Sequence, residues 1–78
     1  MTFNRKVQQL SELITVERVN PGCYRVTRLH DGAEFRVVRA LLGGFNTRCG
    51  VTNVLFRWAP TASRALDDIA SGFNPALR

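Results

Sequence analysis

The sequence predicts a single small α+β domain, with an antiparallel sheet of three to four strands and an N-terminal and a C-terminal helix packed on one face. Apolar residues have helical spacing at both ends of the chain, and the middle is rich in β-branched and aromatic residues that alternate with polar ones. Turn-forming residues separate these runs. A chain of 78 residues has room for one hydrophobic core, so residues 1–78 are expected to form one domain.

The first element is expected to be a helix over about residues 1–13. Asn4 can cap it, and apolar residues follow at helical spacing from Val7 to Ile14. β-Branched residues begin to collect at the end of this helix. The sheet is therefore expected to occupy about residues 14–58.

A β-hairpin is predicted around Asp31-Gly32, the dipeptide that a two-residue type I′ turn prefers. Such a turn pairs Val26 with Val37, and successive side chains then point to opposite faces. The face expected to cover the core carries Tyr24, Val26, Phe35 and Val37, with Arg28 and Arg39 at its margins. The face expected to meet solvent carries Arg25, Thr27, Arg36 and Val38.

The remaining elements follow a break at Gly43-Gly44. Residues 45–50 are expected to form a loop, and residues 51–58 a third strand. The residues of this strand expected on the core face are Val54, Phe56 and Trp58.

The last helix is predicted over residues 61–72. Thr61 caps it and Gly72 stops it, with an apolar stripe between them and the solvated pair Asp67-Asp68 on the opposite face. Residues 73–78 are expected to be an irregular tail.

The positive charge is concentrated in the middle of the chain. The formal net charge is +5, and all of the 11 basic residues except Lys6 are arginine. From Arg18 to Arg57 the only acidic residues are Asp31 and Glu34, whereas basic and acidic residues balance outside that stretch. Arginine offers a planar fork that matches phosphate or carboxylate. A GC-rich genome, whose codons favour arginine, explains the arginine bias equally well.

Residues that usually carry catalysis or bind metal are sparse. His30 and Asp31 adjoin each other, but both fall at the predicted hairpin tip, where solvent is expected to leave each pKa near its ordinary value. Cys23 and Cys49 are expected to be reduced thiols packed as small hydrophobes, with Arg48 beside Cys49 giving only a weak indication of reactivity. We therefore expect no catalytic residue, no metal site and no cofactor.

The arginines of the strands are the candidate binding residues. The predicted partner-binding set is Arg25, Arg36, Arg39, Arg48 and Arg57. Arg25 and Arg36 are expected to form a stripe across the solvated face, with Arg57 as a candidate third member. Because the aromatic residues of the strands fall on the predicted core face, no platform for stacking nucleic-acid bases is expected.

Two partner classes are left open. The preferred hypothesis is a small non-enzymatic binding protein that docks its arginine-rich sheet face on an acidic protein or nucleoprotein. The alternative is a nucleic-acid-binding protein that contacts the phosphate backbone through the same arginines without reading sequence. Many inhibitors encoded by phages and other mobile elements, anti-CRISPR proteins included, are similar in size and style, so inhibition of the partner belongs to the preferred hypothesis.

A homodimer is also predicted as an option, through an edge strand or through the segment from Leu41 to Phe45. For Leu41, Leu42 and Phe45, core packing is the preferred interpretation and an exposed apolar seam the alternative. No apolar run reaches the roughly 20 residues that span a membrane. The first ten residues are polar and basic and lack a secretory signal. We therefore expect a cytoplasmic protein without a membrane partner.

Overall fold

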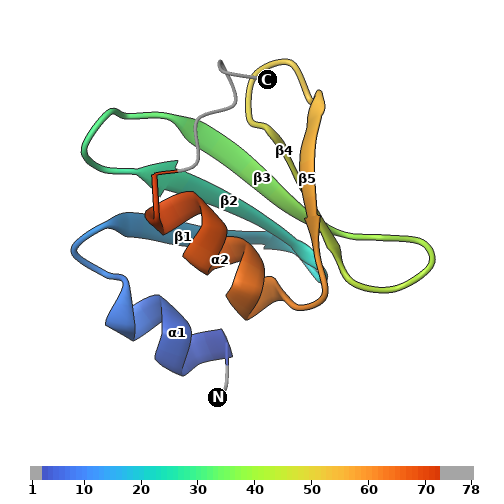
Figure 1. Ribbon diagram of the computed structural model, residues 1–78, viewed down its shortest axis with the longest axis horizontal. Helices are drawn as coiled ribbons and strands as arrows, with labels where there is room; N and C mark the ends of the chain where they lie inside the picture. The colour runs from blue at the N-terminus through green and yellow to red at the C-terminus, as the bar shows by residue number, and fades with distance from the viewer. Residues whose placement is uncertain (1–2, 73–78) are drawn as a thin grey trace.

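The computed structural model describes residues 3–72, which form two layers, a sheet and a pair of helices (Figure 1). The elements are α1 (Phe3–Gln9), β1 (Ile14–Asn20), β2 (Cys23–Arg28), β3 (Glu34–Arg39), β4 (Phe45–Cys49), β5 (Leu55–Ala59) and α2 (Ala62–Ala70). The strands pair antiparallel in chain order, β1-β2-β3-β4-β5. The predicted α+β class is confirmed, but the sheet has five strands instead of three to four.

The hydrophobic core lies between the sheet and α2. The helix buries Ala65, Leu66 and Ile69, which are spaced three and four residues apart and so share one face. The buried apolar residues of the sheet are Ile14, Val26, Phe35, Val37 and Ala59. As predicted, Thr61 caps the helix, its hydroxyl accepting from the Arg64 amide at 3.1 Å.

The first helix also packs on this side of the sheet. Phe3 and Tyr24 bring their ring centroids to 4.5 Å, and Lys6 Nζ lies 3.0 Å from Asp67 Oδ2 on α2. The predicted cap is wrong, because Asn4 lies inside the helix, which already begins at Phe3. Through its ion pair with Lys6, Asp67 connects α2 to α1 in addition to lying on the polar face of α2.

The β2–β3 hairpin has a longer loop and another register than predicted. Residues 29–33 connect the strands, and Val26 pairs with Phe35 where Val37 was expected. The shift is two residues, so it preserves the alternation, and the predicted core and solvated faces are both confirmed. The two-residue turn fails because Asp31 and Gly32 belong to a larger loop that Arg28 and Asp31 hold together.

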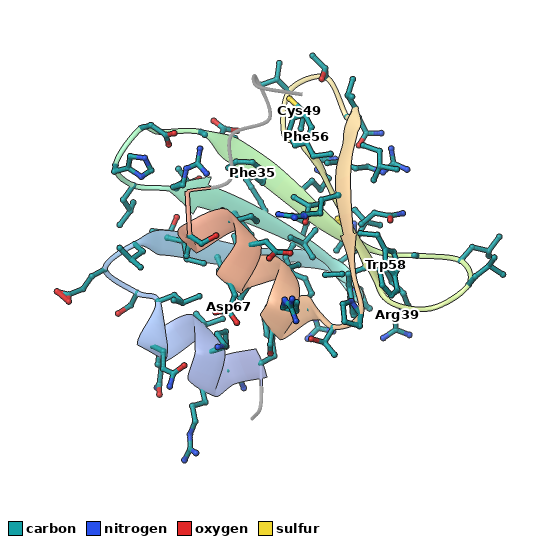
Figure 2. The ribbon with its side chains drawn as sticks, viewed as in Figure 1. Phe35, Arg39, Cys49, Phe56, Trp58 and Asp67 are labelled. Atoms are coloured by element: carbon teal, nitrogen blue, oxygen red, sulfur yellow. The ribbon has the colours of Figure 1, made fainter. Side chains whose placement is uncertain are left out.

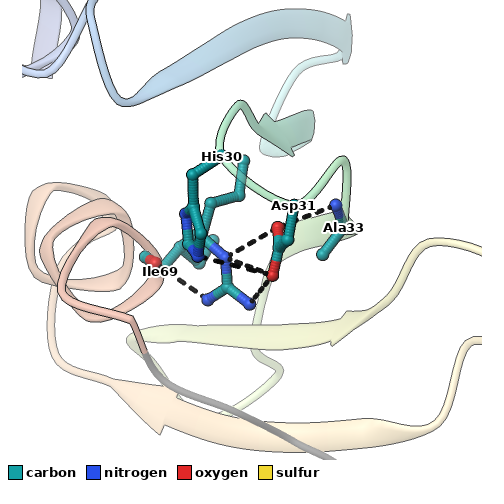
Figure 3. Close-up of polar contacts among 5 residues, drawn as sticks. His30, Asp31, Ala33 and Ile69 are labelled. Atoms are coloured by element: carbon teal, nitrogen blue, oxygen red, sulfur yellow. Dashed lines mark hydrogen bonds and ion pairs between the residues drawn. The ribbon is translucent and has the colours of Figure 1, made fainter.

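Arg28 is buried, with only 4% of its surface exposed, where the sequence placed it at a margin. Its Nη2 and Nε donate to the carboxylate of Asp31 at 2.7 and 3.1 Å, and its Nη1 donates to the carbonyl oxygen of Ile69 at 3.1 Å (Figure 3). Asp31 also accepts from the amide of Ala33 at 3.0 Å. One arginine thus ties the β2–β3 loop to the last turn of α2, where the helix dipole favours a cation.

This ion pair overturns the expectation that Asp31, at the hairpin tip, keeps its ordinary pKa. The hydrogen bonds from Arg28, and then the one from the Ala33 amide, hold the pKa of Asp31 well below its usual range. His30 remains exposed, with its Nε2 3.7 Å from Asp31 Oδ2. Asp31 thus belongs to a structural salt bridge, with the exposed His30 beside it.

The strand β4 occupies residues that were expected to form a loop. Its polar residues pair on both sides, Asn46 with Val38 and Trp58, and Thr47 with Val37 and Arg57. Thr47 is 2% exposed and faces the core. The polar composition of residues 45–50 led to the prediction of a loop. A strand between two neighbouring strands does not require an apolar residue at every inward position, so composition alone did not identify β4.

The strand β5 begins later than predicted and contains an irregularity. Residues 50–54 form the turn, with Asn53 at φ 64°. Leu55 pairs with Arg48, but the next paired residue is Arg57, opposite Thr47, so β5 has one extra residue at Phe56. Phe56 packs against Phe35 at a centroid distance of 6.1 Å, whereas Trp58 is exposed on the other face. The predicted core position of Trp58 is therefore wrong.

Replacing Asp31 with asparagine should lower the thermal unfolding midpoint at neutral pH, because the buried Arg28 loses its counter-charge. In the wild type, the lowered pKa of Asp31 means that the ionised carboxylate stabilises the folded state. This stabilisation is fully present at pH values above the ordinary aspartate pKa of about 3.9, and it is lost as the pH falls below that value. Asp31→Asn should therefore lose less stability than the wild type on acidification. Thermal unfolding by circular dichroism from neutral to acid pH measures both effects.

The matched control is Asp68→Asn, because Asp68 meets Arg64 only at 3.9 Å on the surface of α2. It should change the stability at neutral pH by less than about 0.5 kcal/mol. Identical acid profiles for Asp31→Asn and the wild type would contradict the role given to the Arg28–Asp31 pair.

Candidate functional site

The candidate site is the face of the sheet that points away from both helices, which we call the open face. Within residues 3–72, neither helix covers this face (Figure 1). It receives every second side chain of each strand, and these are the ones that the core does not use. None of the helices in the described part of the chain is long and apolar enough to cross a membrane.

Three arginines stand side by side across the middle of the open face. The strand register places Arg25 opposite Arg36, and Arg36 opposite Arg48, on three consecutive strands. We call this set the arginine row. Glu17 of β1 and Leu55 of β5 continue it at the two ends. The row therefore crosses the whole sheet at nearly a right angle to the strands.

The members of the row differ in how their charge is balanced. Arg25 Nη1 lies 3.3 Å from Glu17 Oε1, and Arg48 Nη1 donates to the carbonyl oxygen of Asn53 at 3.0 Å. The Nε of Arg36 is shielded from solvent and has no hydrogen-bond partner within residues 3–72. Among the described residues, no carboxylate lies within 4.0 Å of the guanidinium groups of Arg36 or Arg48. The unbalanced charge thus lies at the centre of the row, over β3 and β4.

This arrangement costs the fold stability. Like charges at directly opposite positions of neighbouring strands repel each other, by roughly the 0.2–1 kcal/mol that opposite charges would contribute. A buried donor without a partner adds a further cost of about 1–3 kcal/mol. Glu34 shares the open face in the next row, opposite Thr27, but forms no ion pair with the arginine row. A row that the fold does not need is a candidate for binding an anion.

The other two predicted site residues lie on the helix side of the sheet. Arg39 is paired with Phe45, and Arg57 with Thr47, whose side chains both face the core. Both arginines are exposed at the margin of the sheet. The structure therefore brings together Arg25, Arg36 and Arg48, and separates Arg39 and Arg57 from them.

Trp58 is a residue of the open face that the sequence analysis missed. It lies opposite Asn46, is 55% exposed, and donates from its indole Nε1 to the carbonyl oxygen of Gly43 at 3.0 Å (Figure 2). A Cβ on Gly44 would overlap the indole ring, so the glycine makes room for it. Residue composition did not signal this position, because the change of face comes from the extra residue at Phe56 within β5.

The tip of the β3–β4 loop exposes two leucines. Leu41 and Leu42 are 99% and 98% exposed, so core packing, the preferred interpretation of the sequence, is wrong for both. Phe45, at the base of the loop, is partly buried and packs against the core as expected. A hollow of about 360 Å³ lies beside the loop and is lined by Arg39, Ala40, Leu41, Gly43, Gly44 and Phe45.

The two thiols were also candidates for reactivity. Cys23 and Cys49 are both free. Hydrogen bonds from Thr52, first of its side chain and then of its backbone amide, lower the pKa of the Cys49 thiol, so the cause is not the neighbouring Arg48. Across residues 3–72, no three His, Cys, Asp or Glu side chains lie close enough together to hold a metal ion.

Comparison with known proteins gives no relative from which a function could be transferred. The chain matches no protein-family model, no curated protein and no solved structure.

Gly44→Ala should displace the indole of Trp58, because the added Cβ overlaps the ring and the backbone at φ 75° strains any L side chain. We expect a loss of about 1–3 kcal/mol in the free energy of unfolding and an emission spectrum shifted to longer wavelength. The chain has one tryptophan, so its fluorescence reports this ring alone.

Gly32→Ala is the control. Gly32 has a similar φ of 70°, but nothing lies within 4 Å of the added Cβ. Its backbone strain should cost about 1–2 kcal/mol without changing the emission spectrum. A native spectrum in Gly44→Ala would show that the glycine does not position the ring.

Proposed function

We propose that the chain is a non-enzymatic binding protein that docks its open face on an acidic protein or nucleoprotein. The observation that carries the proposal is the arginine row, in which Arg25 stands opposite Arg36 and Arg36 opposite Arg48. Among the described residues, Glu17 is the only carboxylate that forms an ion pair with a member of the row. An anionic partner offsets the repulsion between the arginines, and this makes a favourable contribution to the free energy of binding.

The chemistry of arginine fits such a partner. Each guanidinium presents a planar fork of donors that matches the two oxygens of a carboxylate or phosphate. The flanking residues Val38, Leu55 and Trp58 give the same face apolar area, which a docking surface needs beside its charges. We further propose, from the size of the chain, that docking inhibits the partner.

The double substitution Arg25→Glu/Arg36→Glu should abolish binding of anionic polymers while leaving the fold intact. Poly-L-glutamate and a single-stranded oligonucleotide serve as probes for carboxylate and phosphate surfaces. Fluorescence anisotropy at about 50 and 150 mM salt should show affinity that falls with salt in the wild type. The variant should bind at least about a hundredfold more weakly, because two attractive charges become repulsive.

The control Arg18→Glu/Arg64→Glu makes the same change in net charge away from the arginine row. Arg18 is opposite Tyr24, on the helix side of the sheet, and Arg64 lies on α2. This control should retain most of the affinity, apart from a small general charge effect. Equal binding by a folded Arg25→Glu/Arg36→Glu variant and the wild type would refute the assignment of the open face.

A second candidate function, self-association, is favoured by the exposed β3–β4 tip. Leu41 and Leu42 are almost fully exposed, and apolar residues at such a position usually serve a contact. The two edge strands are less suited to pairing, since irregularities interrupt the register at Arg18–Asn20 and beside Arg48. We therefore propose the tip, and not an edge strand, as the contact in any homodimer.

Light scattering over a roughly hundredfold range of protein concentration tests this contact. If the tip joins two copies, Leu41→Asn/Leu42→Asn should remain monomeric at concentrations where the wild type is dimeric. Leu13→Asn, an exposed leucine remote in sequence from the tip, is the control and should dimerise normally. A wild type that stays monomeric throughout would exclude self-association.

A further inference from the structure

Trp58 has the properties of an aromatic platform. The hydrogen bond from its indole Nε1 to Gly43 and the close fit over Gly44 hold the ring in place, yet more than half of its surface remains exposed. A ring that is fixed before binding loses little conformational entropy when a ligand packs on it. The core does not need this side chain, because Phe56 already fills the space next to Phe35.

The platform shares its face with the unbalanced arginines. Trp58 is opposite Asn46 on β4, and Arg48 is two residues further along the same strand and on the same face. Arg36 lies opposite Arg48 on β3. Side chains one strand and one row apart have Cα atoms about 7–8 Å apart, so a segment of a few nucleotides can span from the ring to the arginines. A cationic row and an exposed ring thus border one continuous surface over β3, β4 and β5.

We propose that the open face binds a single-stranded nucleic acid segment, with phosphates on Arg36 and Arg48 and a base stacked on Trp58. The inference rests on the proposed function and names the chemistry that the open face recognises, whether the strand is free or exposed in a nucleoprotein. A strand alternates phosphates and bases, so it uses both halves of the surface. The arginines alone could bind any polyanion. An exposed aromatic ring adds a site on which a nucleic-acid base, a group that other polyanions lack, can stack.

A duplex fits the open face less well than a single strand. The bases of a duplex are stacked inside and offer no free ring face to Trp58. Groove recognition needs an element that protrudes into the groove, and α1 and α2 both lie on the side of the sheet opposite the open face. A flat sheet face suits an extended single strand whose bases are turned toward the protein.

The test measures the fluorescence of Trp58 during titration with a thymidine oligonucleotide of about twelve nucleotides. Inorganic polyphosphate supplies the same charge without bases, the annealed duplex supplies it with bases hidden, and poly-L-glutamate supplies carboxylates. The oligonucleotide is expected to bind at near-physiological salt and quench the emission. Polyphosphate should bind at low salt with little quenching, and the duplex should bind more weakly than the single strand.

Two variants separate stacking from charge, with binding followed by anisotropy of a labelled oligonucleotide. Trp58→Leu should weaken oligonucleotide binding by about tenfold or more, in line with the loss of one stacked base, and leave polyphosphate binding unchanged. Trp58→Phe keeps a ring and should bind within a few fold of the wild type. Because Trp58 is exposed, neither change should unfold the chain, and circular dichroism verifies this.

The outcomes distinguish this inference from the proposed function. Equal affinity for all the polymers, no quenching and no effect of Trp58→Leu would overturn the inference and leave an open face that docks on anions in general. Tighter binding of poly-L-glutamate than of the oligonucleotide would overturn it in favour of an acidic protein. Failure of the wild type to bind any polymer at low salt would overturn both proposals.

Discussion

The packing of α2 on the sheet is the constraint on which the rest of the structure depends. Leu66 and Ile69 are fully buried together with Val26, Phe35 and Val37, and this contact decides which face of the sheet is the core. Once one face is fixed, the period of two sends the intervening residues to the other face. The alignment of Arg25, Arg36 and Arg48 is therefore a consequence of where the helix packs and of how three strands are paired.

The arginines of the chain divide into two groups with opposite energetics. Arg28 is buried, and it gains a bidentate contact with Asp31 and a helix carbonyl, so it stabilises the fold. Arg36 and Arg48 face each other without a carboxylate partner among the described residues, so their repulsion lowers the stability of the fold. Composition alone cannot separate the two groups, because a salt bridge across a loop and a cationic surface have the same residue type. The distinction depends on which side of each strand an arginine falls.

The sequence was informative where a local pattern decides the structure. The alternation from Tyr24 to Val37 predicted both faces of the central hairpin, even though the pairing shifted by two residues, because such a shift keeps the parity. The last helix followed equally well from its cap, its apolar stripe and its stop. The faces of Arg25 and Arg36, and hence the centre of the candidate site, were thus available from the sequence.

The failures share a cause, which is that tertiary pairing overrides local composition. The polar residues of β4 become a strand because β3 and β5 supply hydrogen-bonding partners on both sides, which composition does not reveal. Leu41 and Leu42 look like core residues, but the loop that carries them extends beyond the helix layer (Figure 1). Hydrophobicity predicts burial only where the backbone brings the residue under another element.

The single extra residue in β5 decides which aromatic ring reaches the open face. Phe56 and Trp58 are two positions apart, so a regular strand would place both rings in the core or both on the open face. The extra residue at Phe56 breaks this parity and lets one ring complete the packing with Phe35 while the other faces outward. A regular β5 would either bury a large indole at the margin of the core or leave the core short of a ring. The irregularity thus lets the fold keep its core and still present an aromatic surface beside the arginine row.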